Sequence, residues 1–161
     1  MMLGTHAALP LIGVTALDIY RISSNKDRLT TNWQLFFIGI GGILPDLLWP
    51  HFSMEGRLSS YTHTLWFILL LIPVTYWISR KMNSKNVLFF SVVFVFAALL
   101  HIVTDAISGG VSFFYPIKGV WGTRLVPYYL WFEADMIFLS IALILNLIRY
   151  RLGTLKIRSV D

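Results

Sequence analysis

Five apolar stretches, separated by short polar segments, divide the chain. They cover about residues 6–22, 33–50, 63–79, 87–107 and 128–148. Each approaches the roughly 20 residues that an α-helix needs to cross the hydrocarbon core of a bilayer. We expect helices because backbone exposed to lipid must satisfy its own hydrogen bonds. The pattern predicts an all-α, polytopic membrane helix bundle of about five transmembrane helices, forming a single domain over residues 1–161.

The composition supports a membrane protein and restricts its chemistry. Hydrophobic residues make up 57% of the chain and charged residues 13%, whereas a soluble domain has roughly 45–50% and about 25%. A soluble monomer or a disordered chain is therefore excluded. The chain has no cysteine, so a metal would be held by His and carboxylate groups, which suit zinc, manganese or iron. No basic stretch precedes the first apolar segment, so we expect that segment to be retained.

Basic residues favour one side of the predicted membrane. Ten of the thirteen Lys and Arg follow the first, third or fifth apolar segment. They are Arg21, Lys26, Arg28, Arg80, Lys81, Lys85, Arg149, Arg151, Lys156 and Arg158. The opposite side holds Arg57, Lys118 and Arg124. Because positive loops stay in the cytoplasm, the bias predicts a multi-pass protein of the cytoplasmic (inner) membrane, N-out and C-in.

Small and aromatic residues occupy positions suited to such a bundle. Gly39, Gly41 and Gly42 in the second segment permit close helix contact, and we expect them to act in packing. The six tryptophans lie mostly near segment ends, as in the aromatic belts that anchor membrane proteins.

Ionisable side chains lie in or beside the apolar segments, where each costs a few kcal/mol unless it is paired. They are His6, Asp46, His51, His63, His101, Asp105, Glu133 and Asp135. The predicted topology places nearly all of them towards the outer side; His51 is expected to be an interfacial loop residue.

The spacing of these groups favours a metal site. His101 and Asp105 are four residues apart and share one helix face. Alone, such a pair is equally consistent with a hydrogen-bonded couple. Together, His6, Asp46, His63, His101 and Asp105 supply three imidazoles and two carboxylates from four segments. That is the ligand set of a catalytic zinc-type centre.

Five short motifs then suggest a family. They are Gly4-Thr5-His6, Gly42-Ile43-Leu44-Pro45-Asp46, Tyr61-Thr62-His63-Thr64, His101-Ile102-Val103-Thr104-Asp105 and Trp131-Phe132-Glu133-Ala134-Asp135. In this order the chain resembles the YdjM-like membrane-bound metal-dependent hydrolases over about residues 4–138. That family is remotely similar to the zinc-dependent phospholipase C and single-strand nuclease superfamily. The resemblance implies that His6, Asp46, His63, His101 and Asp105 are the metal ligands.

The chain departs from the family pattern at two places. The family usually carries His-Arg-Gly shortly before the Thr-His pair. Here Leu58, Ser59 and Ser60 stand there, so we expect the basic, phosphate-contacting group to be missing. Leu48 stands where a second Asp is common. We therefore expect one or two divalent ions, with Zn²⁺ favoured by the ligand types and Mn²⁺ or Fe²⁺ as alternatives.

The predicted function is metal-assisted hydrolysis at the extracytoplasmic face, on a phosphoester or ester bond of a lipid or lipid-linked substrate. Asp46 or Asp105 would ligate the metal or accept the proton of water. Glu133 and Asp135 would orient a ligand histidine, and Glu133 would alternatively complete a second metal site. Arg57 and Arg124, with Lys118, are candidates to hold an anionic head group.

Two other classes remain open at this point. A transport or ion-binding protein also buries His and Asp, although it usually carries them near the midplane between inverted repeats. A structural or adaptor protein with an inactive metal site would keep the same fold. No nucleic-acid partner is expected.

Overall fold

The computed structural model describes residues 3–50, 54–81, 86–117, 119–123 and 125–158. Six α-helices and two 3₁₀ turns occur in these residues: α1 (Leu3–Ser23), α2 (Asn32–Leu48), α3 (Met54–Leu58), η1 (Tyr61–His63), α4 (Leu65–Lys81), α5 (Val87–Ser108), η2 (Tyr128–Leu130) and α6 (Trp131–Arg158). Extended backbone pairs there only in one isolated bridge, between Val111 and Trp121. The predicted all-α class is confirmed.

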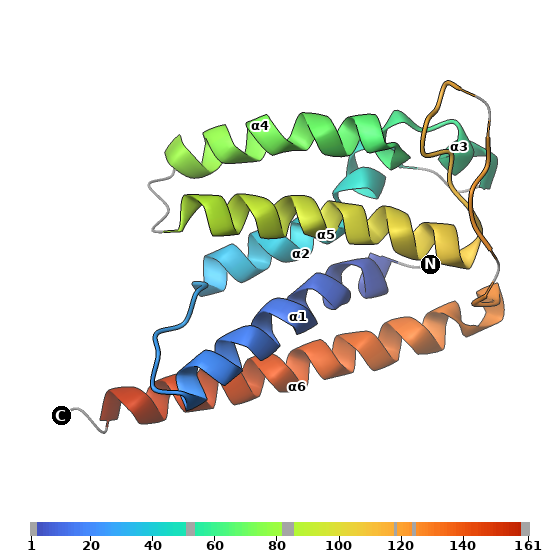
Figure 1. Ribbon diagram of the computed structural model, residues 1–161. Helices are drawn as coiled ribbons and strands as arrows, with labels where there is room; N and C mark the ends of the chain where they lie inside the picture. The colour runs from blue at the N-terminus through green and yellow to red at the C-terminus, as the bar shows by residue number, and fades with distance from the viewer. Residues whose placement is uncertain (1–2, 51–53, 82–85, 118, 124, 159–161) are drawn as a thin grey trace.

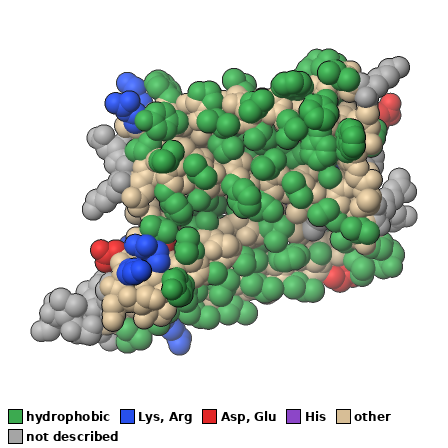
Figure 2. All heavy atoms as spheres, in the orientation of Figure 1, with side chains coloured by type: hydrophobic (Ala, Val, Ile, Leu, Met, Phe, Trp, Pro, Cys, Tyr) green, Lys and Arg blue, Asp and Glu red, His purple; other side chains and the backbone are tan. Residues whose placement is uncertain are grey.

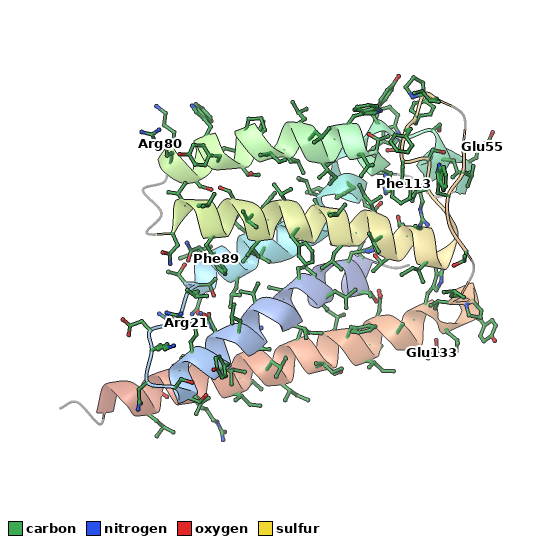
Figure 3. The ribbon with its side chains drawn as sticks, viewed as in Figure 1. Arg21, Glu55, Arg80, Phe89, Phe113 and Glu133 are labelled. Atoms are coloured by element: carbon green, nitrogen blue, oxygen red, sulfur yellow. The ribbon has the colours of Figure 1, made fainter. Side chains whose placement is uncertain are left out.

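The five long helices form a bundle around α5 (Figure 1). α5 contacts α1, α2 and α4, and α6 packs along α1. The last turns of α1, α4 and α6 lie at one end, with the starts of α2 and α5. This end carries Arg21 and Arg80 (Figure 3), and we call it the basic end. The opposite end, here the α3 end, holds the N-terminus, α3 and the connection between α5 and α6.

Local signals in the sequence define the turn between α1 and α2. Asn25 has a φ of 58°, and the Lys26 N–H donates to the Arg21 carbonyl at 2.8 Å. This is the left-handed C-terminal motif that closes many helices. α2 then begins with a capping box, in which Thr31 Oγ1 accepts from the Gln34 N–H and Gln34 Oε1 accepts from the Thr31 N–H.

Two segments differ from the prediction. The stretch before α4 contains α3 and η1, so His63 lies in a 3₁₀ turn and not at the start of a long helix. The last helix was expected over 128–148 but runs from Trp131 to Arg158. The helix continues beyond residue 148 along α1, because the side chain of Arg149 is buried and ion-paired with Asp18 on α1.

Two apolar clusters form the interior. One joins α1, α2 and α5 through Val14, Leu35, Ile38, Phe90 and Ala97. The other joins α4, α5 and the connection after α5, through Ile68, Leu71, Ala98, Ile102 and Val111. In the same connection the Phe113 carbonyl accepts from the Leu65 N–H at 2.9 Å, which binds the connection to the start of α4.

The outer surface of the bundle is apolar (Figure 2). Large hydrophobic side chains such as Leu70, Leu88 and Leu143 are more than 60% exposed. Among the described residues, three helices are long and apolar enough to cross a membrane: α1, α5 and Trp131–Leu155 of α6. α2 and α4 have 17 residues each. An exterior of this kind is stable in lipid and would aggregate in water, which identifies a membrane protein.

Glycines of α2 allow its close contact with α1 and α5. A Cβ at Gly39 would lie 3.3 Å from Leu11, and one at Gly41 would lie 3.2 Å from Phe94. At Gly42 a Cβ would overlap with the carbonyl oxygen of His6. The packing role predicted for these glycines is thus supported, and Gly42 sets the approach of α1 to α2 at the α3 end.

Gly42→Ala is expected to destabilise the protein by about 1–3 kcal/mol, because backbone has to move to admit the methyl group. Thermal unfolding of the purified protein in detergent measures this change. Gly13→Ala is the matched control, since nothing lies within 4 Å of a Cβ at Gly13. Equal unfolding temperatures for the two variants would contradict the close contact.

Candidate metal centre

Four ligand-type side chains meet at the α3 end of the bundle. Asp46 lies near the end of α2, His63 in η1, and His101 and Asp105 one turn apart on α5. One ligand atom from each lies within 4.8 Å of the other three. The His63, His101 and Asp105 side chains are at most 1% exposed, whereas Asp46 is 17% exposed. We call these four residues the metal-type cluster, and Asp46 is its most exposed member.

The spacing within the metal-type cluster suits a tetrahedral ion. His63 Nε2 lies 3.1 Å from Asp46 Oδ1, 3.1 Å from His101 Nε2 and 3.4 Å from Asp105 Oδ2. His101 Nε2 lies 3.5 Å from each of the same two carboxylate oxygens. Zinc bound at about 2.0–2.1 Å in a tetrahedron places neighbouring ligand atoms about 3.3 Å apart. Five of the distances between the ligand atoms thus lie close to that value.

The outer nitrogens of two imidazoles are held by hydrogen bonds. His101 Nδ1 lies 2.8 Å from the Gly42 carbonyl oxygen, which can only accept, so Nδ1 carries the proton and Nε2 presents a lone pair. His63 Nδ1 lies 3.1 Å from Ser60 Oγ and 3.2 Å from Thr62 Oγ1. The Thr62 hydroxyl donates to the Pro45 carbonyl, which leaves hydroxyl oxygens to accept from His63. Partners of this kind fix the tautomer of metal-binding histidines.

His6 of α1 lies directly beside the metal-type cluster. Its ring is stacked 3.9 Å from that of His101, and its Nε2 faces Asp105 Oδ1 at 3.2 Å. The Thr104 hydroxyl donates to a backbone carbonyl of its own helix and lies 2.8 Å from His6 Nδ1, which fixes the orientation of the ring. His6 Nε2 is thus buried and aimed at the carboxylate of Asp105.

This arrangement can accept a cation. With both rings neutral and protonated at Nδ1, the Nε2 atoms of His63 and His101 face each other at 3.1 Å as two lone pairs. His6 Nε2 lies 3.2 Å from Asp105 Oδ1 beside them. Contacts of this kind repel unless a positive charge lies between them. A divalent ion held by imidazoles and carboxylates would remove the repulsion.

Arg57 places a basic group at the cluster, although the family's His-Arg-Gly triplet is absent. It is 5% exposed, and its Nε lies 3.1 Å from Asp105 Oδ2. The short helix α3 brings it to the cluster from the position directly before the expected triplet. Arg57 was a candidate for binding an anionic substrate, and the structure places it at the cluster.

The two acidic residues of α6 do not orient an imidazole directly. Asp135 Oδ1 accepts from the Thr5 N–H at 2.8 Å and from its hydroxyl, and Oδ2 accepts from the Gly4 N–H. Asp135 therefore binds the first turn of α1, next to His6, instead of holding a ring nitrogen. Glu133 is exposed and lies on the outside of α6 (Figure 3). In the described residues Glu133 therefore lies apart from the ligand histidines.

Several predicted or relevant residues remain to be placed. Arg124, the second candidate for substrate binding, lies outside the described residues, as do His51 and Lys118. Sequence reasoning missed the groups that hold the imidazoles: Ser60, Thr104 and the Gly42 carbonyl. Ser60 and Thr104 lie within three residues of a predicted ligand, which is the only signal that pointed to them.

Comparisons with known proteins give one result. No curated protein and no solved structure matches the chain. A family model does match: the model of the YdjM inner membrane protein covers residues 1–157, nearly the whole chain. The motifs that carry the metal-type cluster lie inside this range. The chain therefore belongs to the YdjM inner membrane protein family.

Proposed function

We propose that this protein is a membrane-embedded, metal-dependent hydrolase with its centre at the metal-type cluster. The observation that carries the proposal is the convergence of two imidazole nitrogens and two carboxylate oxygens, buried and at tetrahedral spacing. Asp46, His63, His101 and Asp105 would hold one divalent ion, for which zinc is the best fit. His6 and Oδ1 of Asp105 would hold a second.

A divalent ion bound there would supply Lewis acidity and lower the pKa of a water molecule towards neutrality. The protein supplies the surroundings. Asp46 is the most exposed of the four ligand candidates, so a substrate approaches on its side. Its carboxylate is a candidate to accept the proton of the attacking water. Asp105, which is buried and contacts three imidazoles, serves as the central ligand.

Arg57 is the group that would bind an anionic substrate. It places a positive charge beside the metal-type cluster through its contact with Asp105. Guanidinium groups form strong paired hydrogen bonds to phosphate oxygens, which favours a phosphoester over a neutral ester. Arg124 remains a second candidate for this role.

The membrane arrangement that we propose has five spans, with the N-terminus outside and the C-terminus inside. Arg21 and Arg80 lie at the end opposite Glu55 and Glu133 (Figure 3), and positive ends stay in the cytoplasm. The metal-type cluster would then face the extracytoplasmic side.

A lipid or lipid-linked substrate is supported by the surroundings of the cluster. Exposed aromatic rings gather at the α3 end, where Trp66 packs near Phe114 and Tyr61 near Tyr115. Aromatic side chains of this kind are typical of the membrane interface. A lipid head group at that level would reach the cluster from within the bilayer.

The test is turnover of membrane lipid extract, followed by mass spectrometry of the products. We expect the wild-type protein to release products and Asp46→Asn to do so about 10²–10⁴-fold more slowly, the usual contribution of a general base. Glu133→Gln is the control, because it changes an exposed carboxylate at the same end. Metal content is measured on the same samples. Equal product profiles for the wild-type protein and Asp46→Asn, with metal bound in both, would reject the enzyme and favour a structural metal site.

A further inference from the structure

A second site lies at the basic end, opposite the metal-type cluster. A cavity of about 360 Å³ is formed there between the end of α1, the start of α2 and the last turns of α6. It is lined by Ile22, Lys26, Asp27, Arg28, Asn32, Tyr150, Gly153 and Thr154. None of these residues takes part in the metal-type cluster, so the cavity needs a separate explanation. We call it the basic cavity.

The loop that carries the cations of the basic cavity is firmly held. Asp18, which is fully buried, accepts from the Leu29 N–H at 2.6 Å and from the Thr30 hydroxyl. Arg149 of α6 donates to Asp18 Oδ2 at 2.9 Å and to the Thr30 carbonyl. These bonds fix the loop directly after Arg28, and Arg21 Nε, which donates to the Asp27 carbonyl at 2.9 Å, fixes it directly before. The cavity is therefore a built feature of the fold.

The charges in this lining favour an anion. Lys26 and Arg28 are exposed, and within the described part of the chain neither forms an ion pair. Asp27 contributes one negative charge, which leaves the lining with a net positive charge. Arg149 lies beneath the lining, and its charge is compensated by Asp18.

Polar groups complete the binding surface. Asn32, whose Oδ1 accepts from Arg149 Nη1 at 2.9 Å, connects the buried network to the cavity wall. Tyr150 supplies a hydroxyl group on α6, whereas the Thr154 hydroxyl donates to the Arg151 carbonyl at 2.7 Å. Two cations with hydroxyl and amide groups match the oxygens of a phosphate.

The surroundings indicate where such a phosphate would come from. The outer surface of α6 next to the cavity is apolar, with Leu147 and Leu155 about 60% exposed. A phospholipid could place its acyl chains along this surface and its head group in the cavity. Basic pockets between helices at the end of a membrane bundle bind anionic lipid head groups in this way.

We propose that the basic cavity binds the phosphate of an anionic phospholipid head group, with Lys26 and Arg28 as its cations. The site is independent of the metal-type cluster and of any turnover there. It does not depend on which side of the membrane the basic end faces.

The experiment uses the full chain in nanodiscs of zwitterionic lipid with and without phosphatidylglycerol, and native mass spectrometry counts retained lipid. We expect the wild-type protein to retain phosphatidylglycerol. Lys26→Gln with Arg28→Gln should weaken retention about 25-fold, because each cation near an anionic lipid contributes roughly fivefold. The control is Arg80→Gln with Lys81→Gln, which removes the same charge at the same end but outside the cavity. Equal losses in both double variants would overturn the proposal.

A second variant tests the cavity without changing charge. Nothing lies within 4 Å of a Cβ at Gly153, so Gly153→Leu should fold normally and fill the space. We expect it to weaken retention as well, whereas Gly13→Leu, at an equally open position on α1, should not. Unchanged retention in Gly153→Leu would overturn the proposal. Inorganic phosphate added in detergent is the last arm: if it raises the unfolding temperature as much as phosphatidylglycerol, the ligand is a soluble anion and not a lipid.

Discussion

Asp105→Ala is expected to lose the bound metal, with an affinity for Zn²⁺ at least about a hundredfold below that of the wild-type protein. Loss of a residue that only orients a metal ligand lowers the metal affinity about 10–100-fold. Asp105 is itself a ligand candidate, so its loss should lower the affinity at least as much. Its two oxygens face His6 on one side and His63 and His101 on the other. Elemental analysis of the purified protein and competition with a chelator of known affinity measure the effect.

Glu133→Ala serves as the control for this experiment, since Glu133 is an exposed carboxylate at the same end of the bundle. It should keep the metal content of the wild-type protein. His63→Ala should behave like Asp105→Ala. If the wild-type protein and all three variants hold the same small amount of metal, the metal centre is refuted.

Arg149→Ala should produce the largest loss of stability outside the metal centre. The substitution leaves the carboxylate of Asp18 buried and removes donors to Asn32 and Thr30. Breaking a buried ion pair from one side costs about 3–5 kcal/mol. For a chain of this size that corresponds to a drop in unfolding temperature of roughly 10 °C. Thermal unfolding in detergent measures it.

Arg151→Ala is the matched control, because it removes an exposed arginine two residues away on the same helix. Its unfolding temperature should stay close to that of the wild-type protein. Asp18→Ala combined with Arg149→Ala should cost less than the sum of the single changes, since the two residues share one interaction. Additive losses would show that the pair does not act as a unit.

The ligand candidates could be selected from the sequence because ionisable groups are rare and costly in apolar segments. His6, Asp46, His63, His101 and Asp105 do lie together in the structure. The same reasoning failed for Asp135 and Glu133. Their motif does not predict which face of α6 packs against the bundle. In the structure Asp135 binds the start of α1, whereas Glu133 faces outward.

A count of basic residues along the chain does not reveal which of them are buried. Arg57 and Arg149 were both treated as loop charges, and both are buried in ion pairs. Counting charges predicts which side of a membrane a segment favours. It does not predict whether a guanidinium meets a carboxylate on another helix.

The sequence by itself determined that this protein is helical, apolar on its outside and basic at one end, because hydropathy and charge depend on each residue and its near neighbours. The tertiary structure alone decided which side chains meet. Thr104 holds His6 across 98 residues and Arg149 holds Asp18 across 131. Contacts over such separations follow from how the helices rotate and pack, which no local pattern records.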